Sequence, residues 1–364
     1  MAPASSEFVR GLPKVELHIH MEGALSPSLR YRVAKRNGIP QIQETEEEMV
    51  RDYQDAFNNI LTGEITLEAA GKVFFDHFFD GIKVMIKEED FYELAMSYFE
   101  NAAKTNIRYA EIFVDFQSIM ETVSLDIAMS GYRKAQIEAE KNYNLKVEWI
   151  LSFDRSKEPA DLMRAYEESL THRDIIKGFA LAGISDGSGL MKFNEVFTRA
   201  RKDGFFITAH VEAESTQNLH ECLSQVGGHG LDRLDHGMKV GEQQDLMNLI
   251  KKRNIGLTIC PWVTYGPAKL MTDHESAVQT VFENGIRKLC NHEVLVAVGS
   301  DDPALAGGRW LEDNLSLLTD VAGFTEEELL NLQLSAVRSS WASDKHKAEL
   351  DEEIRTYAAN FKSP

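Results

Sequence analysis

The stretch Val15-Glu16-Leu17-His18-Ile19-His20 lies near the N-terminus and reads as a short β-strand. Its apolar residues alternate with Glu16, His18 and His20, and a strand turns alternate side chains to the same face. The two histidines therefore leave one strand end side by side. Neutral imidazole is a common ligand of zinc and neighbouring transition metals, so the pair is a candidate half of a metal site. Two histidines at this spacing also occur by chance, so the rest of the chain must supply further ligands.

Strand-like and helix-like segments alternate along the rest of the chain. The strands that we expect are 15–20, 107–113, 146–153, 178–181, 205–210, 233–236, 256–260 and 295–300. Helices are expected at 124–143, 160–171, 192–203, 216–226, 241–253 and 276–285. Eight strands alternating with helices imply a parallel α/β fold of the (β/α)8 TIM-barrel type. We therefore predict one barrel over residues 1–364, in which residues 28–104 form a helical insertion after the first strand.

Polar residues fall at the ends of several expected strands. Beyond the first strand, His210 ends the fifth and His236 ends the sixth, while Asp301 and Asp302 follow the eighth. The carboxyl ends of the strands in such a barrel converge on one face, where active sites are built. The sequence therefore predicts that these side chains meet the two histidines of the first strand.

Four of the residues at these strand ends make a candidate metal shell with a coordination position left for water. A metal bound in this way lowers the pKa of its water toward neutrality and provides a nucleophile. His236 is not needed as a ligand, so we expect it to orient or deprotonate that water. Asp302 is free to contact a substrate. The expected ligands are His18, His20, His210 and Asp301, of which Asp301 also accepts a hydrogen bond from the attacking water.

Composition limits the possible partners and compartments. The chain has 364 residues and a net charge of −19, so it has no broad attraction for nucleic acid or an anionic membrane. A small-molecule substrate remains, and net charge does not exclude an anionic one. The three cysteines, at 222, 260 and 290, have no CxxC spacing, which is typical of a reducing compartment. The first residues contain no apolar run, so we expect a cytoplasmic protein.

Six segments carry a resemblance to a known family, in the order in which that family has them. They are 13–23 (PKVELHIHMEG), 178–183 (GFALAG), 208–210 (TAH), 233–237 (RLDHG), 260–261 (CP) and 300–303 (SDDP). Together they resemble the adenosine and adenine deaminases of the zinc-dependent amidohydrolase barrels. The resemblance extends from residue 11 to about residue 320, which is most of the chain.

The resemblance implies a role for each matching residue. The four expected ligands look like those of one catalytic zinc, and His236 looks like the residue that activates its water. Asp302 matches the residue that hydrogen-bonds purine nitrogen 7, and the backbone N–H of Gly183 matches the group that meets nitrogen 3. His20 and Glu22 are expected beside the substrate. The implied reaction is attack of hydroxide on carbon 6 and loss of the exocyclic amine as ammonia, beneath a lid formed by the helical insertion.

Two features of the sequence indicate which branch of the family the chain resembles. Glu22 stands where the nucleoside enzymes usually carry an aspartate that meets the ribose, and residues 300–308 (SDDPALAGG) resemble the adenine-deaminase version of that loop. We therefore predict deamination of adenine or an amine-substituted adenine, with an adenosine deaminase as the alternative. Trp262 and Tyr265, after the Cys-Pro pair, either pack or shape the pocket for an alkylated amine.

One departure from the family touches catalysis directly. The family places a glutamate three residues after its fifth-strand histidine, where it shares a proton with ring nitrogen 1, and this chain has Ala213 there. Losing such a general acid typically costs orders of magnitude in rate. Glu214, or alternatively Glu212, would have to replace it, and we expect Glu214. Otherwise the chain is a purine-binding pseudoenzyme or an engineered inactive variant. The sequence does not predict the oligomeric state.

Overall fold

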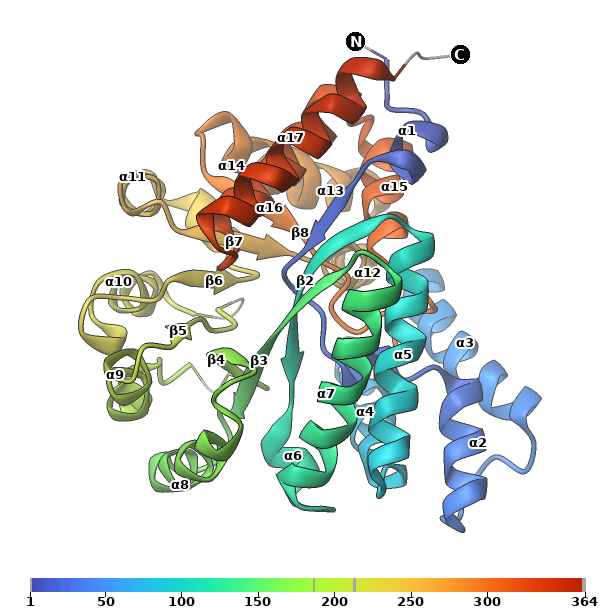
Figure 1. Cartoon of the computed structure of the whole chain (residues 1–364). Helices are drawn as coiled ribbons and strands as arrows, with labels where there is room; N and C mark the ends of the chain where they lie inside the picture. Colours follow the sequence, from blue (N-terminus) through green and yellow to red (C-terminus); the bar gives the residue numbers. More distant parts are fainter. Residues whose placement is uncertain (1, 186, 212–213, 362–364) are drawn as a thin grey trace.

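The computed structural model describes residues 2–185, 187–211 and 214–361, and its centre is a barrel of parallel strands (Figure 1). Every strand pairing among the described residues is parallel, as strand–helix alternation requires. The strands are β1 (Lys14–Glu16), β2 (Ile107–Val114), β3 (Lys146–Asp154), β4 (Ile176–Ala182), β5 (Phe206–Ile207), β6 (Arg233–Asp235), β7 (Gly256–Ile259) and β8 (Leu295–Val298).

Two isolated bridges join the two sheets into a closed ring. Strands β1 to β5 form one sheet in sequence order, and β6 to β8 form the other. His210 pairs with Asp235 to connect the segment after β5 with β6, and Ile19 pairs with Asp301 to connect the segments after β1 and β8. The predicted (β/α)8 barrel is therefore confirmed. Both bridges that close the ring involve an expected site residue, His210 in one and Asp301 in the other.

Strands β1 and β5 are shorter than the sequence predicted. The segment after β1 alternates between neighbours, since the amide of Phe113 donates to the Ile19 carbonyl and that of His20 donates to the Asp301 carbonyl. Similarly, His210 donates its amide to the Leu181 carbonyl. Backbone pairing thus continues to the barrel mouth as single bridges, which fix the strand-end histidines without a regular ladder.

Helices dominate the segment between β1 and β2. Figure 1 shows α2, α3 and α4 grouped on one side of the barrel, and α5 packs against α7 and β2 as a barrel helix does. Serine or threonine caps the first three, because Ser26, Thr45 and Thr66 each accept the amide three residues on. The elements are α2 (Pro27–Asn37), α3 (Glu46–Thr62), α4 (Leu67–Val84) and α5 (Glu88–Lys104).

The remaining helices surround the barrel and cover its amino end. Figure 1 shows α17 crossing α16 near α1 and both termini. No helix among the described residues is long and apolar enough to cross a membrane. These elements are α1 (Ser6–Gly11), α6 (Phe116–Met120), α7 (Leu125–Asn142), α8 (Pro159–Ser169), α9 (Asn194–Lys202), α10 (Thr216–Ser224), α11 (Gln244–Arg253), α12 (Pro261–Met271), α13 (His274–Val278), a π-helix (Gln279–Arg287), α14 (Lys288–Asn291), α15 (Leu311–Ala322), α16 (Glu326–Ser339) and α17 (Asp344–Asn360).

A buried polar group, here called the amino-end cluster, consists of Glu111, Arg233 and Trp341. Arg233, the first residue of β6, pairs with Glu111 of β2 through its Nη1, and its guanidinium carbon lies 4.2 Å from the centre of the Trp341 indole. The backbone N–H of Trp341 donates to Glu111 Oε1 at 2.5 Å. Opposite charges therefore meet inside the barrel, on the side of its amino end.

Candidate active site

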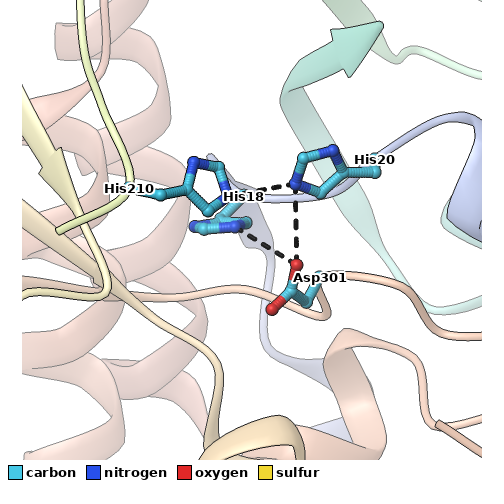
Figure 2. Close-up of side chains that lie close together, drawn as sticks. All are labelled: His18, His20, His210 and Asp301. Carbon is cyan, nitrogen blue, oxygen red and sulfur yellow. Dashed lines mark hydrogen bonds and ion pairs between the residues drawn. The ribbon is translucent and has the colours of Figure 1, made fainter. Parts of the chain in front are cut away.

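Three histidines and one aspartate converge at the carboxyl end of the barrel (Figure 2). His20 Nε2 lies 3.1 Å from His210 Nε2 and 3.6 Å from Asp301 Oδ1. His18 Nε2 lies 3.4 Å from the same carboxylate oxygen. Tetrahedral bonds of about 2.0–2.1 Å to one zinc ion would place two ligand atoms about 3.3 Å apart. The structure thus brings all four predicted ligands, which we call the histidine cluster, to separations that suit one shared metal ion.

The other ring nitrogen of each histidine is already bonded to an acceptor. His20 Nδ1 lies 2.8 Å from Asp115 Oδ2, and His210 Nδ1 lies 3.2 Å from the Leu181 carbonyl oxygen. His18 Nδ1 lies 2.8 Å from the Thr258 hydroxyl, which itself donates to Asp235. Each Nδ1 therefore carries the proton, and each Nε2 presents a lone pair to the shared centre.

A buried nitrogen without a hydrogen-bond partner also indicates that the cluster fits a metal ion. Among the described residues, His18 Nε2 is a buried nitrogen with no hydrogen-bond partner. Burying such a group without a partner costs free energy, so native proteins rarely leave one. A cation at the shared centre would bond His18 Nε2 together with the other three ligands. The residues present therefore fit a metal ion.

His236 adjoins this centre, with its ring centre 4.7 Å from that of His18. Its Nε2 lies 3.6 Å from Asp301 Oδ2, the oxygen opposite the one that faces His18 and His20. His236 and Asp301 both have a φ of +62°, which non-glycine residues seldom adopt. Such backbone strain, of about 1–3 kcal/mol per residue, is typical of functional sites. Both strained residues therefore lie where the predicted chemistry occurs.

A cavity of about 370 Å³ opens beside the histidine cluster. Such a volume is within the range of about 300–1,000 Å³ for small-molecule pockets. Four phenylalanines of α4 form an apolar wall, and carboxylates lie on the barrel side. The lining residues are His20, Phe74, Phe75, Phe78, Phe79, Asp115, Ser118, Asp154, Ala182, Gly183, Ile184, Ser185, His210, His236, Asp301 and Asp302.

The two residues expected to contact a purine, Gly183 and Asp302, both line this cavity. Burial and the neighbouring carboxylates of Asp301 and Asp115 raise the pKa of Asp302 well above its ordinary value. Gly183 has a φ of +91°, which explains why glycine follows β4. Gly23 also approaches closely, since a Cβ there would be 1.8 Å from Asp302 Oδ1. Backbone therefore packs against the Asp302 carboxyl where a larger residue would collide.

Glu22 does not lie among the lining residues. Its Oε2 accepts the backbone N–H of Asp115 at 3.0 Å, and its Oε1 accepts the Tyr132 hydroxyl at 2.8 Å. Burial, followed by the Asp115 carboxylate, raises the pKa of Glu22 to about 7. Because Asp115 in turn holds His20, the structure connects Glu22 to a histidine of the cluster.

Glu214 is not a lining residue either, although it bonds Ser185, which is one. Its Oε1 lies 3.2 Å from Arg155 Nη1 and accepts the Ser185 hydroxyl at 2.8 Å, while its Oε2 accepts Asn218 Nδ2 at 2.8 Å. Arg155 Nη2 donates to the His210 carbonyl at 2.5 Å. The other two positions of this motif, Glu212 and Ala213, lie outside the described residues.

Sequence reasoning missed Asp115 and Asp154. Asp115 follows β2 and Asp154 ends β3, so the strand-end rule that found His210 would have found both. Trp262 and Tyr265, in contrast, do not line the cavity, and Trp262 packs against Phe57 with ring centres 5.9 Å apart.

Comparison with known proteins identifies the family to which the chain belongs. The sequence model of the adenosine deaminase family matches residues 13–357. An adenine deaminase of Acinetobacter baylyi is 31% identical over 351 residues, which cover 96% of this chain and 98% of that protein.

Solved structures agree with this match. The crystal structure of an adenine deaminase from Arthrobacter aurescens has a TM-score of 0.83 at 27% identity, and the match covers 96% of this chain and all of that one. An amidohydrolase from Burkhoderia ambifaria with bound zinc has a TM-score of 0.81 at 22% identity, over 99% of both chains. The motifs, the barrel and the histidine cluster all agree with these matches, and the chain belongs to the adenosine deaminase family of metal-dependent hydrolytic deaminases.

Proposed function

We propose that this chain uses one zinc ion to hydrolyse the bond between carbon 6 and the exocyclic amine of adenine. The observation that carries the proposal is the set of three imidazoles whose Nε2 atoms face Asp301 at the cavity wall. Three histidines and a carboxylate suit zinc and leave a position for water. The zinc in the Burkhoderia structure supports the choice of metal.

His18, His20, His210 and Asp301 would hold the metal. When bound, the zinc would polarise a water molecule and make it nucleophilic at neutral pH. His236 Nε2 would accept a proton from that water, and Asp301 Oδ2, 3.6 Å from it, would orient the water by accepting a hydrogen bond. The strained backbone at both residues fixes these two acceptors relative to each other.

The purine would lie across the barrel mouth with carbon 6 toward the histidine cluster. Asp302 would meet nitrogen 7 and the Gly183 N–H would meet nitrogen 3, and both groups line the same cavity. The phenylalanines of α4 would cover the ring and exclude water, as a lid does. The exocyclic amine would leave as ammonia.

Protonation of nitrogen 1 is the remaining step of the proposed reaction. We propose Glu214 for it, and the proton would have to reach nitrogen 1 from a carboxylate that is bonded to Arg155, Ser185 and Asn218. These contacts favour the competing candidate, a purine-binding protein with impaired catalysis. Glu214→Gln separates the two, because it removes the acid and preserves much of the shape.

The cavity favours a neutral base over a nucleotide. Its described lining includes four aspartates and no lysine or arginine. A phosphate monoester would approach carboxylates without a cation to compensate, which costs free energy. We also propose that the protein acts in the cytoplasm and without nucleic acid, in agreement with its net charge of −19 and three free cysteines.

The test is metal analysis combined with an ammonia-release screen. The substrates are adenine, adenosine, adenosine monophosphate and amine-alkylated adenines, and the proteins are the natural chain, Glu214→Gln and Ala213→Glu. We expect about one zinc per chain and the highest kcat/KM for adenine. Zinc without turnover, with activity restored in Ala213→Glu, would instead identify a disabled deaminase. No turnover by either protein would leave a purine-binding protein.

A further inference from the structure

One carboxylate of the active cavity has no role in the proposed chemistry. Of the four aspartates that line the cavity, Asp301 belongs to the histidine cluster, Asp115 holds His20, and Asp302 is proposed to meet purine nitrogen 7. Asp154 remains. It is half-buried at the carboxyl end of β3, and the Ser156 amide and hydroxyl donate to its two oxygens, each at 2.8 Å. An ionised carboxylate has about four acceptor positions, so Asp154 keeps further ones for a ligand.

Asp154 lies beside Gly183, the backbone group that is proposed to donate to purine nitrogen 3. Strands β3 and β4 are neighbours, and Asp154 pairs in register with Ala182. A Cβ placed on Gly183 would be 3.3 Å from Asp154 Oδ1. The amide of Arg155 donates to the Ala182 carbonyl at 3.0 Å and fixes the two strand ends together. On one wall of the cavity, a residue with a backbone N–H donor, Gly183, thus lies next to a carboxylate acceptor, Asp154.

This pair matches the chemistry of one edge of a free purine. Nitrogens 3 and 9 are both bonded to carbon 4 and lie on the same edge of the ring system. Nitrogen 3 accepts a hydrogen bond, and nitrogen 9 of the free base carries a hydrogen. In a nucleoside, nitrogen 9 carries the sugar instead, so it has no hydrogen to donate.

We propose that Asp154 accepts the hydrogen of purine nitrogen 9 and thereby selects the free base over the nucleoside. The inference rests on the proposed function, because it uses the proposed position of Gly183 at nitrogen 3. Hydrogen bonds to a charged acceptor contribute enough to change affinity about 10- to 100-fold. A purine substituted at nitrogen 9 loses this bond and also places its substituent against the carboxylate. Specificity for the base therefore follows from one side chain at the end of β3.

The proposal is tested by comparing adenine with 9-methyladenine, which differs in the nitrogen 9 hydrogen. Binding to the zinc-loaded full chain is measured by calorimetry, and turnover by ammonia release, for the natural protein and Asp154→Asn. The natural protein should bind adenine about 10- to 100-fold more tightly than 9-methyladenine. Asp154→Asn should remove most of that preference by weakening adenine alone. Because the bond exists in the ground state and the transition state alike, KM should rise more than kcat falls.

The controls separate a recognition role from a structural one. Asp161→Asn changes the next aspartate along the chain, which pairs with Arg164 on α8 outside the cavity, and it should leave both affinities unchanged. Zinc content should be the same in all three proteins. Equal weakening of adenine and 9-methyladenine by Asp154→Asn would overturn the proposal. So would a larger loss for adenosine than for adenine, since that would assign the carboxylate to ribose hydroxyls.

The binding measurement also separates this proposal from the proposed function. If the natural chain deaminates neither purine but binds adenine more tightly than 9-methyladenine, and Asp154→Asn abolishes that difference, the recognition role stands and the deaminase proposal fails. If adenine is deaminated but 9-methyladenine reacts and binds equally well, the deaminase proposal stands and the role of Asp154 is overturned.

Discussion

The barrel buries ionisable side chains at both ends, and the two groups differ in how their charges are satisfied. In the amino-end cluster, Arg233 meets the Glu111 carboxylate and the face of Trp341, so the charges of the protein neutralise each other. In the histidine cluster at the carboxyl end, His18 and its neighbours direct lone pairs at one another, and His18 Nε2 has no partner. A self-neutralising group can stabilise the fold by itself, whereas an incomplete one requires something from outside the chain. Charge pairing within the chain, and not the number of satisfied hydrogen bonds, thus distinguishes the two groups, because Arg233 Nε and Nη2 also lack hydrogen-bond partners but have opposite charges beside them.

Replacing His236 should change the rate strongly and the stability little. We choose His236→Asn, because asparagine tolerates the φ of +62° better than alanine does. Loss of the general base should lower kcat by about 10²- to 10⁴-fold. Zinc content should remain at that of the natural protein, because His236 is not a proposed ligand. Ammonia release and metal analysis check both statements, and an undiminished rate would remove His236 from the mechanism.

Replacing Glu111 should have the opposite pattern. Glu111→Ala removes the carboxylate that bonds the buried Arg233 guanidinium and leaves it only Asp235, 3.6 Å from Nε, and breaking such a pair typically costs about 3–5 kcal/mol of unfolding free energy. The folded fraction should keep its zinc and its kcat/KM, because Glu111 bonds Arg233, Trp341 and Tyr109 and none of these is a proposed zinc ligand. Urea unfolding measures the loss. The matched control is Glu111→Leu combined with Arg233→Met, which removes both charges and should recover most of the stability.

Strand-end residues explain how much of this arrangement the sequence could predict. Strands of a parallel barrel are buried on both faces, so they appear as apolar runs, and the polar residue that ends a run lies at the mouth. This rule located His210 and Asp301 correctly at one centre. Applied to β2 and β3, it would also have located Asp115 and Asp154, which the motif comparison passed over.

Other contacts depend on packing that no local pattern encodes. Glu22 is next to the first strand in sequence, but its partners are a backbone N–H after β2 and Tyr132 of α7. Glu214 similarly meets Arg155, which is 59 residues away. Sequence spacing identifies which residues approach the mouth, whereas the direction of each carboxylate follows from tertiary packing.

A weaker effect should follow from loosening the support of the histidine cluster. Asp115→Asn replaces the carboxylate that holds His20 Nδ1 at 2.8 Å with a neutral amide. Such partners of metal-bound histidines typically contribute 10- to 100-fold to metal affinity or activity. We expect a decrease of that size in zinc affinity, measured by competition with a chelator. Glu111→Ala should not change zinc affinity. A decrease in zinc affinity in that variant would contradict the separation of a structural group from a metal-binding group.

The effect that is smallest per pH unit concerns Lys14, a buried cation at the amino end of β1. Its Nζ donates to the carbonyls of Arg10, Leu12 and Thr105 at 3.2, 2.9 and 2.8 Å, and burial lowers the pKa of its ammonium group to about 7. The unfolded chain has a lysine pKa of about 10.4, so between pH 7 and pH 10 the unfolded state binds more protons than the folded state. Lys14 should therefore make the unfolding free energy rise with pH in this window, by at most about 1.4 kcal/mol per pH unit.

Urea unfolding of the natural protein and Lys14→Met at pH 7, 8 and 9 isolates this slope. The variant should lose the rise with pH, so the difference in unfolding free energy between the two proteins should change from pH 7 to pH 9. Identical slopes would mean that the ammonium group keeps its proton when folded, held by those carbonyls. Lys14 would then join Arg233 as a buried cation that groups of the chain itself hold in its charged form, and the contrast between the two ends of the barrel would become sharper.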